Sequence, residues 1–302
     1  MNAPIIPVPI TDYREQAKKI FESLDVNETT RQDYQYRIGA FADFVISRGF
    51  NRNSFLEFKR YLGGRTDTAV ATKNKYLASA RIFLKELNRL GLIQTDITQN
   101  VKSFTQSKKH KRDGLNGEEM QRLANWLQQL PPTPPNARLK AIISLLALQG
   151  LRQIEITRLD VKDLDIVNKT AFVQGKGQAD KELIHLHPET AKTLQEYLKS
   201  NKIADGALFI SRSNNSQRQR LTTRGLRKIV QEVLSYLSVE KTVHGFRHYF
   251  TTTLISTYKG DLLDVMQYTR HKSVDTLQIY NDKVRQKADL PRFYNTFSKL
   301  SF

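Results

Sequence analysis

The sequence contains no cysteine, which excludes disulfide bonds and thiolate zinc sites. It also lacks the roughly 20 consecutive apolar residues that a membrane-spanning helix needs, and it carries no lipidation signal. The first residues, MNAPIIPVPITDYREQ, have no basic region followed by an apolar core, so they do not resemble a secretory signal. We therefore expect a cytoplasmic protein that does not bind membranes.

Acidic residues are in the minority. The 302 residues include 48 Lys and Arg against 30 Asp and Glu, which gives a formal net charge of +18 at pH 7. A surplus of this size attracts polyanions over a Debye length of about 8–10 Å, so nucleic acid is the leading partner. The hydrophobic fraction of 39% is typical of a globular protein, and the length predicts about two domains.

The first hundred residues have a helical pattern. Proline-rich residues 1–10 are expected to be extended, whereas residues 11–102 place apolar side chains at the three-to-four spacing of amphipathic helices. Asn27 is a favourable cap for one helix, residues 55–62 predict a short helix closed by two glycines, and residues 66–68 are expected to cap a long one. This half therefore predicts a bundle of about four helices.

Residues 103–114, SFTQSKKHKRDG, are polar and form the best candidate for a linker between domains. Two interpretations of its basic cluster stay open. It is either a solvated loop or a strap that follows a nucleic-acid backbone, where phosphate contacts position DNA without reading its sequence. The residues of this basic cluster are Lys108, Lys109, Lys111 and Arg112.

The second half combines helical and strand-like patterns. Helical periodicity resumes after Asn116, is broken by PPTPP at 131–135, and continues in a largely apolar segment. The predicted fold class is mainly α with a small antiparallel β-sheet, in which a helical bundle is followed by an α+β domain at 115–285. Three β-rich runs predict the strands of that sheet, at 164–167, 170–174 and 183–186.

The segment HGFRHYFTTTLI places His244, Arg247 and His248 on one face of a predicted helix. A metal site with His271 as third ligand is disfavoured, because zincins have Glu after the first His where Gly245 stands, and a guanidinium repels a cation. A guanidinium beside imidazoles suits an anion such as phosphate instead. An arginine taken alone fits a simple ion pair equally well.

Four other residues have ordinary explanations when each is taken alone. His185 and His187 lie on one face of a predicted strand, but no third ligand has a convincing spacing, so we interpret them as structural. Tyr280 alone fits a half-buried core tyrosine, and Lys176 alone fits a solvated lysine in a turn. None of them indicates a function by itself.

The segments GLRQIEI, QGKG, HGFRH and RHKSVDTLQIY occur in the order and approximate spacing of the tyrosine recombinases of the phage integrase family. The resemblance covers nearly the whole chain and is to the simple two-domain, Xer- or Cre-like type. It implies a helical, SAM-like core-binding domain at 11–102 and a catalytic domain at 115–285 that close around duplex DNA. The family's active-site residues match Arg152, Lys176, His244, Arg247, His271 and Tyr280.

The resemblance implies that Tyr280 forms a 3′-phosphotyrosyl link, that His244 accepts its proton, and that Lys176 acts as general acid. A phenol with a pKa near 10 costs roughly 4 kcal/mol to ionise at pH 7, and nearby cations lower that cost. Arginines and histidines aimed at the phosphate oxygens also stabilise the transition state without a metal. We therefore expect no metal, no ATP and no other cofactor.

The sequence departs from the family pattern before His271, where members usually have a glycine and this chain has Arg270. This arginine could contact DNA, contact a neighbouring subunit, or point outward. An acidic residue, Glu155, follows Arg152 by three positions and would lie on the same side of a helix. Glu155 either orients active-site groups or forms a structural ion pair at the start of a helix.

Residues 286–302 form a tail in which Phe293, Phe297 and Leu300 have helical spacing after Pro291. The tail either docks on its own core or, as the resemblance implies, passes to a neighbouring protomer. In the second case a homotetramer would form on double-stranded DNA with inverted-repeat core sites. The free protein is then expected to be a monomer or weak oligomer, and the need for an accessory protein stays open.

Three functions are compatible with this sequence. The leading one is a site-specific DNA recombinase that acts in integration, excision, resolution or inversion. The others are a type IB topoisomerase-like enzyme that relaxes DNA and a non-catalytic DNA-binding protein of recombinase descent. The complete set of six active-site matches argues against the last, and the helical first domain and the tail favour the first over the second. The target sequence and the biological role stay open.

Overall fold

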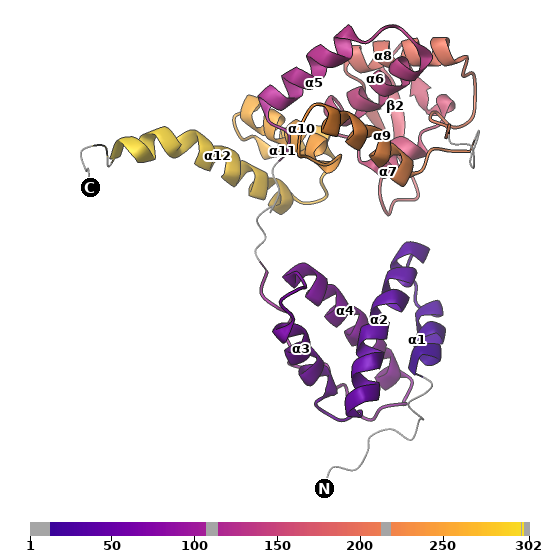
Figure 1. Cartoon of the computed structure of the whole chain (residues 1–302), viewed down its shortest axis with the longest axis vertical. Coiled ribbons are helices and arrows are strands. Elements are labelled where there is room, and N and C mark those ends of the chain that lie inside the picture. The colour runs from indigo at the N-terminus through magenta and orange to yellow at the C-terminus, as the bar shows by residue number, and fades with distance from the viewer. Residues whose placement is uncertain (1–12, 107–113, 213–218, 297, 299–302) are drawn as a thin grey trace. The chain divides into compact units, whose positions relative to one another are not determined.

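The computed structural model describes residues 13–106, 114–212, 219–296 and 298. These residues fall into two compact units, one before and one after residues 107–113 (Figure 1). The basic cluster of the predicted linker lies outside the described residues. In the described part of the chain, no helix combines the length and the apolar composition that crossing a membrane requires.

The N-terminal unit is a helical bundle, as the sequence predicts. Its core is rich in aromatic side chains, and the rings of Phe41 and Phe58 meet edge to face with centroids 5.1 Å apart. Leu62, Leu77 and Leu84 fill the space around them and are fully buried. The helices of the unit are α1 (Tyr13–Glu22), α2 (Glu28–Arg48), α3 (Ser54–Gly64) and α4 (Val70–Arg89).

Local chemistry explains where these helices begin. The Asn27 side chain accepts a hydrogen bond from the Thr30 amide at 2.9 Å, which confirms the predicted cap of α2. The cap predicted at 66–68 is wrong, because α4 begins only after Ala69. The Asp67 carboxylate is held by the guanidinium of Arg65 at 2.7 Å, so it does not reach the helix.

The C-terminal unit contains the predicted three-stranded antiparallel sheet in the order β1-β2-β3. Leu164 pairs with Ala171, and Thr170 pairs with His185. Alternate residues of the middle strand, Ala171 and Val173, are buried, because one face of the sheet covers the core. The strands are β1 (Leu164–Asp165), β2 (Thr170–Gln174) and β3 (Lys181–His185), with the 3₁₀ turn Val161–Asp163 before β1.

Helices form the rest of the unit. The apolar segment after PPTPP is the buried helix α6, and its first residue is Pro134, so the last two prolines belong to its first turn rather than to the break before it. The helices are α5 (Gly117–Gln129), α6 (Pro134–Ala147), α7 (Gln153–Arg158), α8 (Pro188–Asn201), α9 (Thr223–Tyr236), α10 (His244–Thr257), α11 (Leu262–Thr269) and α12 (Val274–Thr296).

Helices α10, α11 and α12 share a small apolar cluster apart from the main core, formed by Ile255, Val265, Leu277 and Tyr280. The C-terminal half of α12 extends away from the rest of the unit (Figure 1). This helix continues through Pro291, so the tail does not begin a new helix there. Tyr280 lies in the second turn of this long helix.

Candidate active site

The turn before α7 positions two arginines. Gly150 has φ +56, and a Cβ atom at this position would come within 2.3 Å of the Phe250 ring, so the turn requires glycine. Two residues later, Arg152 stands at the N-cap of α7. The carbonyl oxygen of Gly150 accepts a hydrogen bond of 2.7 Å from Nη1 of Arg247 on α10. The same turn therefore sets where Arg152 leaves the backbone and holds the guanidinium of Arg247.

Glu155 is fully buried and binds two arginines. Arg152 lies three residues before it, and Arg270 lies 115 residues after it. One carboxylate oxygen accepts from Arg152 Nη1 at 2.7 Å. The other accepts from the Arg152 amide and from Arg270 Nη2, each at 2.8 Å. Burial raises the pKa of Glu155, but the charge of Arg270 and the hydrogen bonds from Arg152 outweigh it, so the net shift is downward and the carboxylate is charged.

Arg270 does not point outward, because its side chain is only 8% exposed and is turned toward Glu155. The outward orientation considered for this residue is therefore wrong. Arg270 ends α11 in the left-handed region, with φ 53. Its contact with Glu155 joins the end of α11 to the first turn of α7.

Arg247 is buried at the centre of the cluster. Its Nη2 donates to the carbonyl oxygen of Thr269 and lies 3.4 Å from Nε2 of His271. Burial and the charges of Arg152 and Arg270 lower the pKa of Arg247 to about 10, although Glu155 opposes the shift. The guanidinium therefore keeps its charge at neutral pH.

Tyr280 packs beside this cluster from α12 and is only 2% exposed. Its ring centroid lies 5.9 Å from that of His271 and 4.6 Å from that of His248. Burial raises the pKa of Tyr280, and the charges of Arg247 and Arg152 oppose that rise. The phenol is therefore protonated at neutral pH, while the charges of the two arginines favour its ionised form.

The predicted site residues thus divide into two groups. One group converges, although it comes from three separate segments of the sequence: Arg152, Arg247, His271 and Tyr280. His244 is the exposed first residue of α10, one turn before Arg247. Lys176 projects from the exposed turn between β2 and β3, and the structure, within its described ranges, gives it no hydrogen bond or ion pair.

Sequence reasoning missed His248 as a partner of Tyr280. The signal was present, since His248 follows His244 by one helical turn and Arg247 by one residue. The other histidine pair is separate from the cluster. His187 caps α8 by accepting a hydrogen bond of 3.2 Å from the Glu189 amide, in keeping with the structural role predicted for it.

A basic groove lies along the first turns of α9, with a cavity volume of ≈ 990 Å³. Arg224, Arg227 and Lys228 line it from the helix. Arg220 also lines it, but this guanidinium is held by the carbonyl oxygens of Thr157 and Leu159. Glu232 is the acidic member of the lining, and the three basic side chains from α9 outnumber it, so the groove suits a polyanion.

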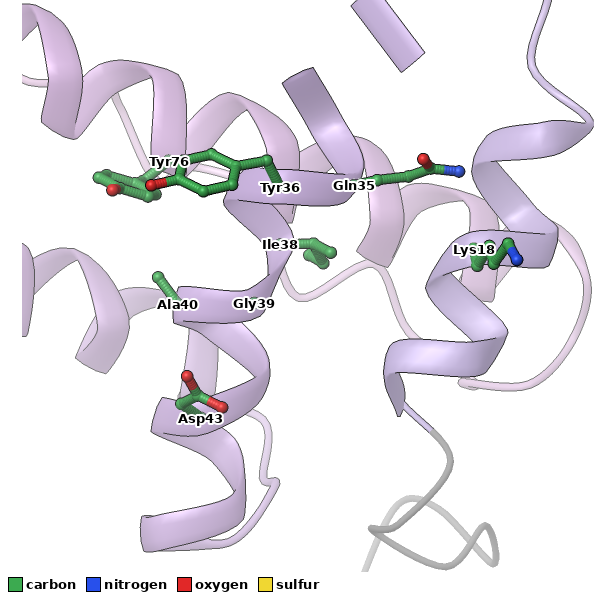
Figure 2. A pocket seen from close by; sticks show the side chains of 8 residues that line it. All are labelled: Lys18, Gln35, Tyr36, Ile38, Gly39, Ala40, Asp43 and Tyr76. Atoms are coloured by element: carbon green, nitrogen blue, oxygen red, sulfur yellow. The ribbon is translucent and has the colours of Figure 1, made fainter. Parts of the chain in front are cut away.

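The N-terminal unit contains a separate pocket of ≈ 530 Å³. Figure 2 shows Tyr36 and Tyr76 beside each other at one side of it, with Lys18 and Asp43 on other parts of the rim. None of the six predicted active-site residues lines this pocket. Its mixture of aromatic, cationic and anionic groups suits binding rather than the predicted chemistry, and we assign it no catalytic role.

Comparison with known proteins places these features in context. The model of the phage integrase family matches residues 114–287. The chain is 30% identical over 305 residues to tyrosine recombinase XerD of Oceanobacillus iheyensis, covering 87% of this chain and 98% of that protein. It is 29% identical over 221 residues to tyrosine recombinase XerC of Lactobacillus delbrueckii subsp. bulgaricus, covering 70% of this chain and 72% of that protein.

Solved structures of similar fold include XerH site-specific recombinase bound to a palindromic difH substrate, in a post-cleavage complex. It has a TM-score of 0.72 and 18% identity, and the match covers 97% of this chain and 99% of that one. A lambda integrase dimer bound to a COC′ core site has a TM-score of 0.67 and 14% identity, covering 90% and 94%. At these identities the likeness shows a common fold.

Proposed function

Because the chain belongs to the phage integrase family, we propose that this tyrosine site-specific recombinase cuts and rejoins DNA through a covalent bond between Tyr280 and a DNA phosphate. The observation that carries the proposed active site is the convergence of Arg152, Arg247, His271 and Tyr280. A nucleophile can attack the phosphorus, and two guanidinium groups and an imidazole can stabilise the charge that develops on the phosphate. Together they allow phosphoryl transfer without a metal.

In the proposed first step, the Tyr280 oxygen attacks the phosphorus of a DNA phosphodiester, and the bond from phosphorus to the 5′ oxygen breaks. The phenol proton passes to His244, and Lys176 gives a proton to the leaving 5′ oxygen. The products are a 3′-phosphotyrosyl link and a free 5′ hydroxyl. A second strand's 5′ hydroxyl then attacks the link, restores a phosphodiester and returns the phenol, so neither ATP nor a metal is consumed.

The charges of the site support these roles. Arg152 and Arg247 oppose the rise in the pKa of Tyr280 that burial causes, so the same two guanidinium groups favour the attacking phenolate. They also neutralise the nonbridging oxygens as negative charge gathers there. The imidazole of His271 lies beside Arg247, with its Nε2 atom 3.4 Å from Nη2, and we assign it to the same phosphate. Each group is more effective in a buried site than in water.

We propose double-stranded DNA with inverted-repeat core sites as the partner. The net charge of +18 and the basic groove on α9 support it, and XerH and lambda integrase were solved on DNA sites. The N-terminal unit would serve as the core-binding domain and the second as the catalytic domain. A homotetramer, linked by exchange of the tail after residue 286, would join two sites. A cytoplasmic location fits an enzyme that acts on DNA.

The test is to trap the covalent intermediate. Wild type, Tyr280→Phe and Tyr236→Phe are incubated in EDTA with plasmid or nicked duplex that carries candidate sites, and the products are separated in SDS. We expect an adduct with wild type and with Tyr236→Phe, because Tyr236 is 73% exposed on α9 and away from the cluster. Tyr280→Phe should bind DNA without forming an adduct. An adduct that survives loss of Tyr280 would contradict the proposal.

The products of the same reactions separate recombination from relaxation of DNA. A recombinase exchanges strands between two sites and gives plasmids of new connectivity, whereas a topoisomerase-like enzyme changes only the supercoiling of each plasmid. We expect new connectivity when two sites are present and none when one site is deleted. Specific binding without any adduct, even after partner proteins are added, would instead indicate a DNA-binding protein that lacks catalysis.

A further inference from the structure

Arg270 and Glu155 are 115 residues apart in the sequence, yet the Arg270 Nη2 atom lies 2.8 Å from a Glu155 carboxylate oxygen. Both side chains are withdrawn from solvent, with 8% and 0% exposure. A pair this deeply buried has a charged hydrogen bond that water screens little. The contact therefore fixes the end of α11 against the start of α7.

The backbone conformation at Arg270 is uncommon for a residue other than glycine. The residue has φ 53 and ψ 42, a left-handed conformation that favours glycine at the end of a helix. Lys202 ends α8 with nearly the same angles, φ 53 and ψ 45, but its side chain is exposed. The conformation thus does not itself require a buried side chain, and the distinctive feature of Arg270 is the partner that its guanidinium reaches.

The turn that follows α11 is held from two sides. Arg247 binds the carbonyl oxygen of Thr269, and Glu155 binds the side chain of Arg270, so the residues directly before His271 are fixed at two successive positions. Glu155 also binds Arg152 through two hydrogen bonds. One carboxylate thereby sets the distance between the segment that carries Arg152 and the segment that carries His271.

We propose that Arg270 is a positioning residue, which acts through Glu155 to hold His271 and Arg152 in the geometry that DNA cleavage needs. This inference rests on the proposed function of the cluster. We assign the Arg270 guanidinium to Glu155 and not to a phosphate, because a carboxylate already neutralises its charge, whereas the groups that Arg247 binds are uncharged carbonyl oxygens. The effect of Arg270 is therefore on the rate of the chemical step and not on affinity for DNA.

The test compares Arg270→Gly, Arg270→Lys and Lys202→Gly with wild type. Each glycine variant removes one cation from a left-handed position, so Lys202→Gly matches the change in charge and backbone without touching the cluster. Two quantities are measured: the single-turnover rate of forming the Tyr280 adduct at saturating enzyme, and the dissociation constant for DNA from a titration with enzyme. The thermal unfolding of every variant is measured to check that the substitution keeps the fold.

We expect Arg270→Gly to slow adduct formation roughly 10- to 100-fold while the dissociation constant stays within about 3-fold of wild type. Lys202→Gly should match wild type in both quantities. Arg270→Lys should recover part of the rate, because an ammonium keeps the charge but not the planar fork. In a Glu155→Gln background, Arg270→Gly should add little further loss, since both changes break one contact.

Two results would overturn the inference while leaving the proposed function intact. One is an active wild type with an equally active Arg270→Gly. The other is a loss confined to DNA affinity, which would make Arg270 a direct DNA contact. A wild-type protein that forms no Tyr280-dependent adduct would instead refute the proposed function, and the positioning role with it.

Discussion

The imidazole of His248 packs against the phenol of Tyr280, with ring centroids 4.6 Å apart and an angle of 58° between the ring planes. The two side chains are 5% and 2% exposed and come from α10 and α12. The helix that carries Arg247 therefore also supports the ring of the proposed nucleophile. Disturbing this one ring contact should affect both stability and cleavage.

His248→Ala should lower the free energy of unfolding by about 2–3 kcal/mol, because it leaves a cavity beside Tyr280. His248→Phe fills the same space and should cost less. Adduct formation should fall with the alanine variant, since the phenol loses one side of its support. Equal stability of the alanine variant and wild type in chemical denaturation would contradict this account of the packing.

Arg247→Lys should reduce the single-turnover rate of adduct formation by about 10²–10³-fold, because a lysine cannot bind Gly150, Thr269 and a phosphate at once. DNA affinity should change little, since lysine keeps the positive charge at this position. Arg292→Lys is the matched control, because Arg292 is 86% exposed on α12. Comparable losses in both variants would show that the cluster has no special role.

Lys176→Ala should slow cleavage of ordinary DNA by about 10²–10⁴-fold, the usual contribution of a general acid. A substrate with sulfur in place of the leaving 5′ oxygen should largely restore the rate, because a thiolate leaves without a proton. The same substrate should not rescue His244→Ala, because this variant lacks the group that accepts the phenol proton of Tyr280. Failure of sulfur to rescue Lys176→Ala would remove the general-acid role from this lysine.

Glu155→Gln should destabilise the protein by about 3 kcal/mol at pH 7, since it leaves the guanidinium groups of Arg152 and Arg270 without their carboxylate. The folded state lowers the pKa of Glu155 below its ordinary value of 4.5. Its stabilisation is therefore complete above about pH 4.5 and is lost as the pH falls through the lower, folded value. The difference in the free energy of unfolding between wild type and Glu155→Gln should therefore shrink as the pH falls.

Denaturation curves between pH 7 and pH 3 measure this difference directly. Glu118→Gln is the control, because Glu118 is exposed in the first turn of α5 and should shift stability by less than about 0.5 kcal/mol at any pH. A gap between wild type and Glu155→Gln that stays constant down to pH 3 would show that ionised Glu155 does not stabilise the fold.

The basic cluster at residues 108–112 should be tested through the salt dependence of DNA binding. If all four cations contact phosphates, replacing them with alanine reduces the magnitude of the negative slope of log K against log salt by about 3.6, at about 0.9 for each contact. An unchanged slope would favour the solvated loop. The replaced residues are Lys108, Lys109, Lys111 and Arg112.

Local features of the fold follow from the sequence. Asn27 caps α2 as predicted, and Asn116 caps α5 in the same way, because the side chain of an asparagine reaches the free amides of the next turn without help from distant residues. The cap at 66–68 failed because Asp67 found a closer partner in Arg65. Helix starts are thus predictable where no neighbouring charge competes for the capping group.

The active-site cluster was predictable only in part. The six matching residues indicate which side chains to consider, but Lys176 and His244 lie exposed in this structure while Arg152 and Arg247 are tied to the cluster. The contact between Arg270 and Glu155 has no sequence signal, because tertiary packing brings together residues 115 positions apart. Such contacts depend on how α7, α10 and α11 pack, which local periodicity does not determine.

The near-complete burial of Tyr280 has a consequence for chemical labelling. Tyr36 and Tyr236 are 79% and 73% exposed, whereas Tyr280 is 2% exposed. A reagent that nitrates accessible phenols will therefore modify the first two long before it reaches the third. The rate of Tyr280 nitration, followed by mass spectrometry of its peptide, therefore measures how often α12 separates from α10.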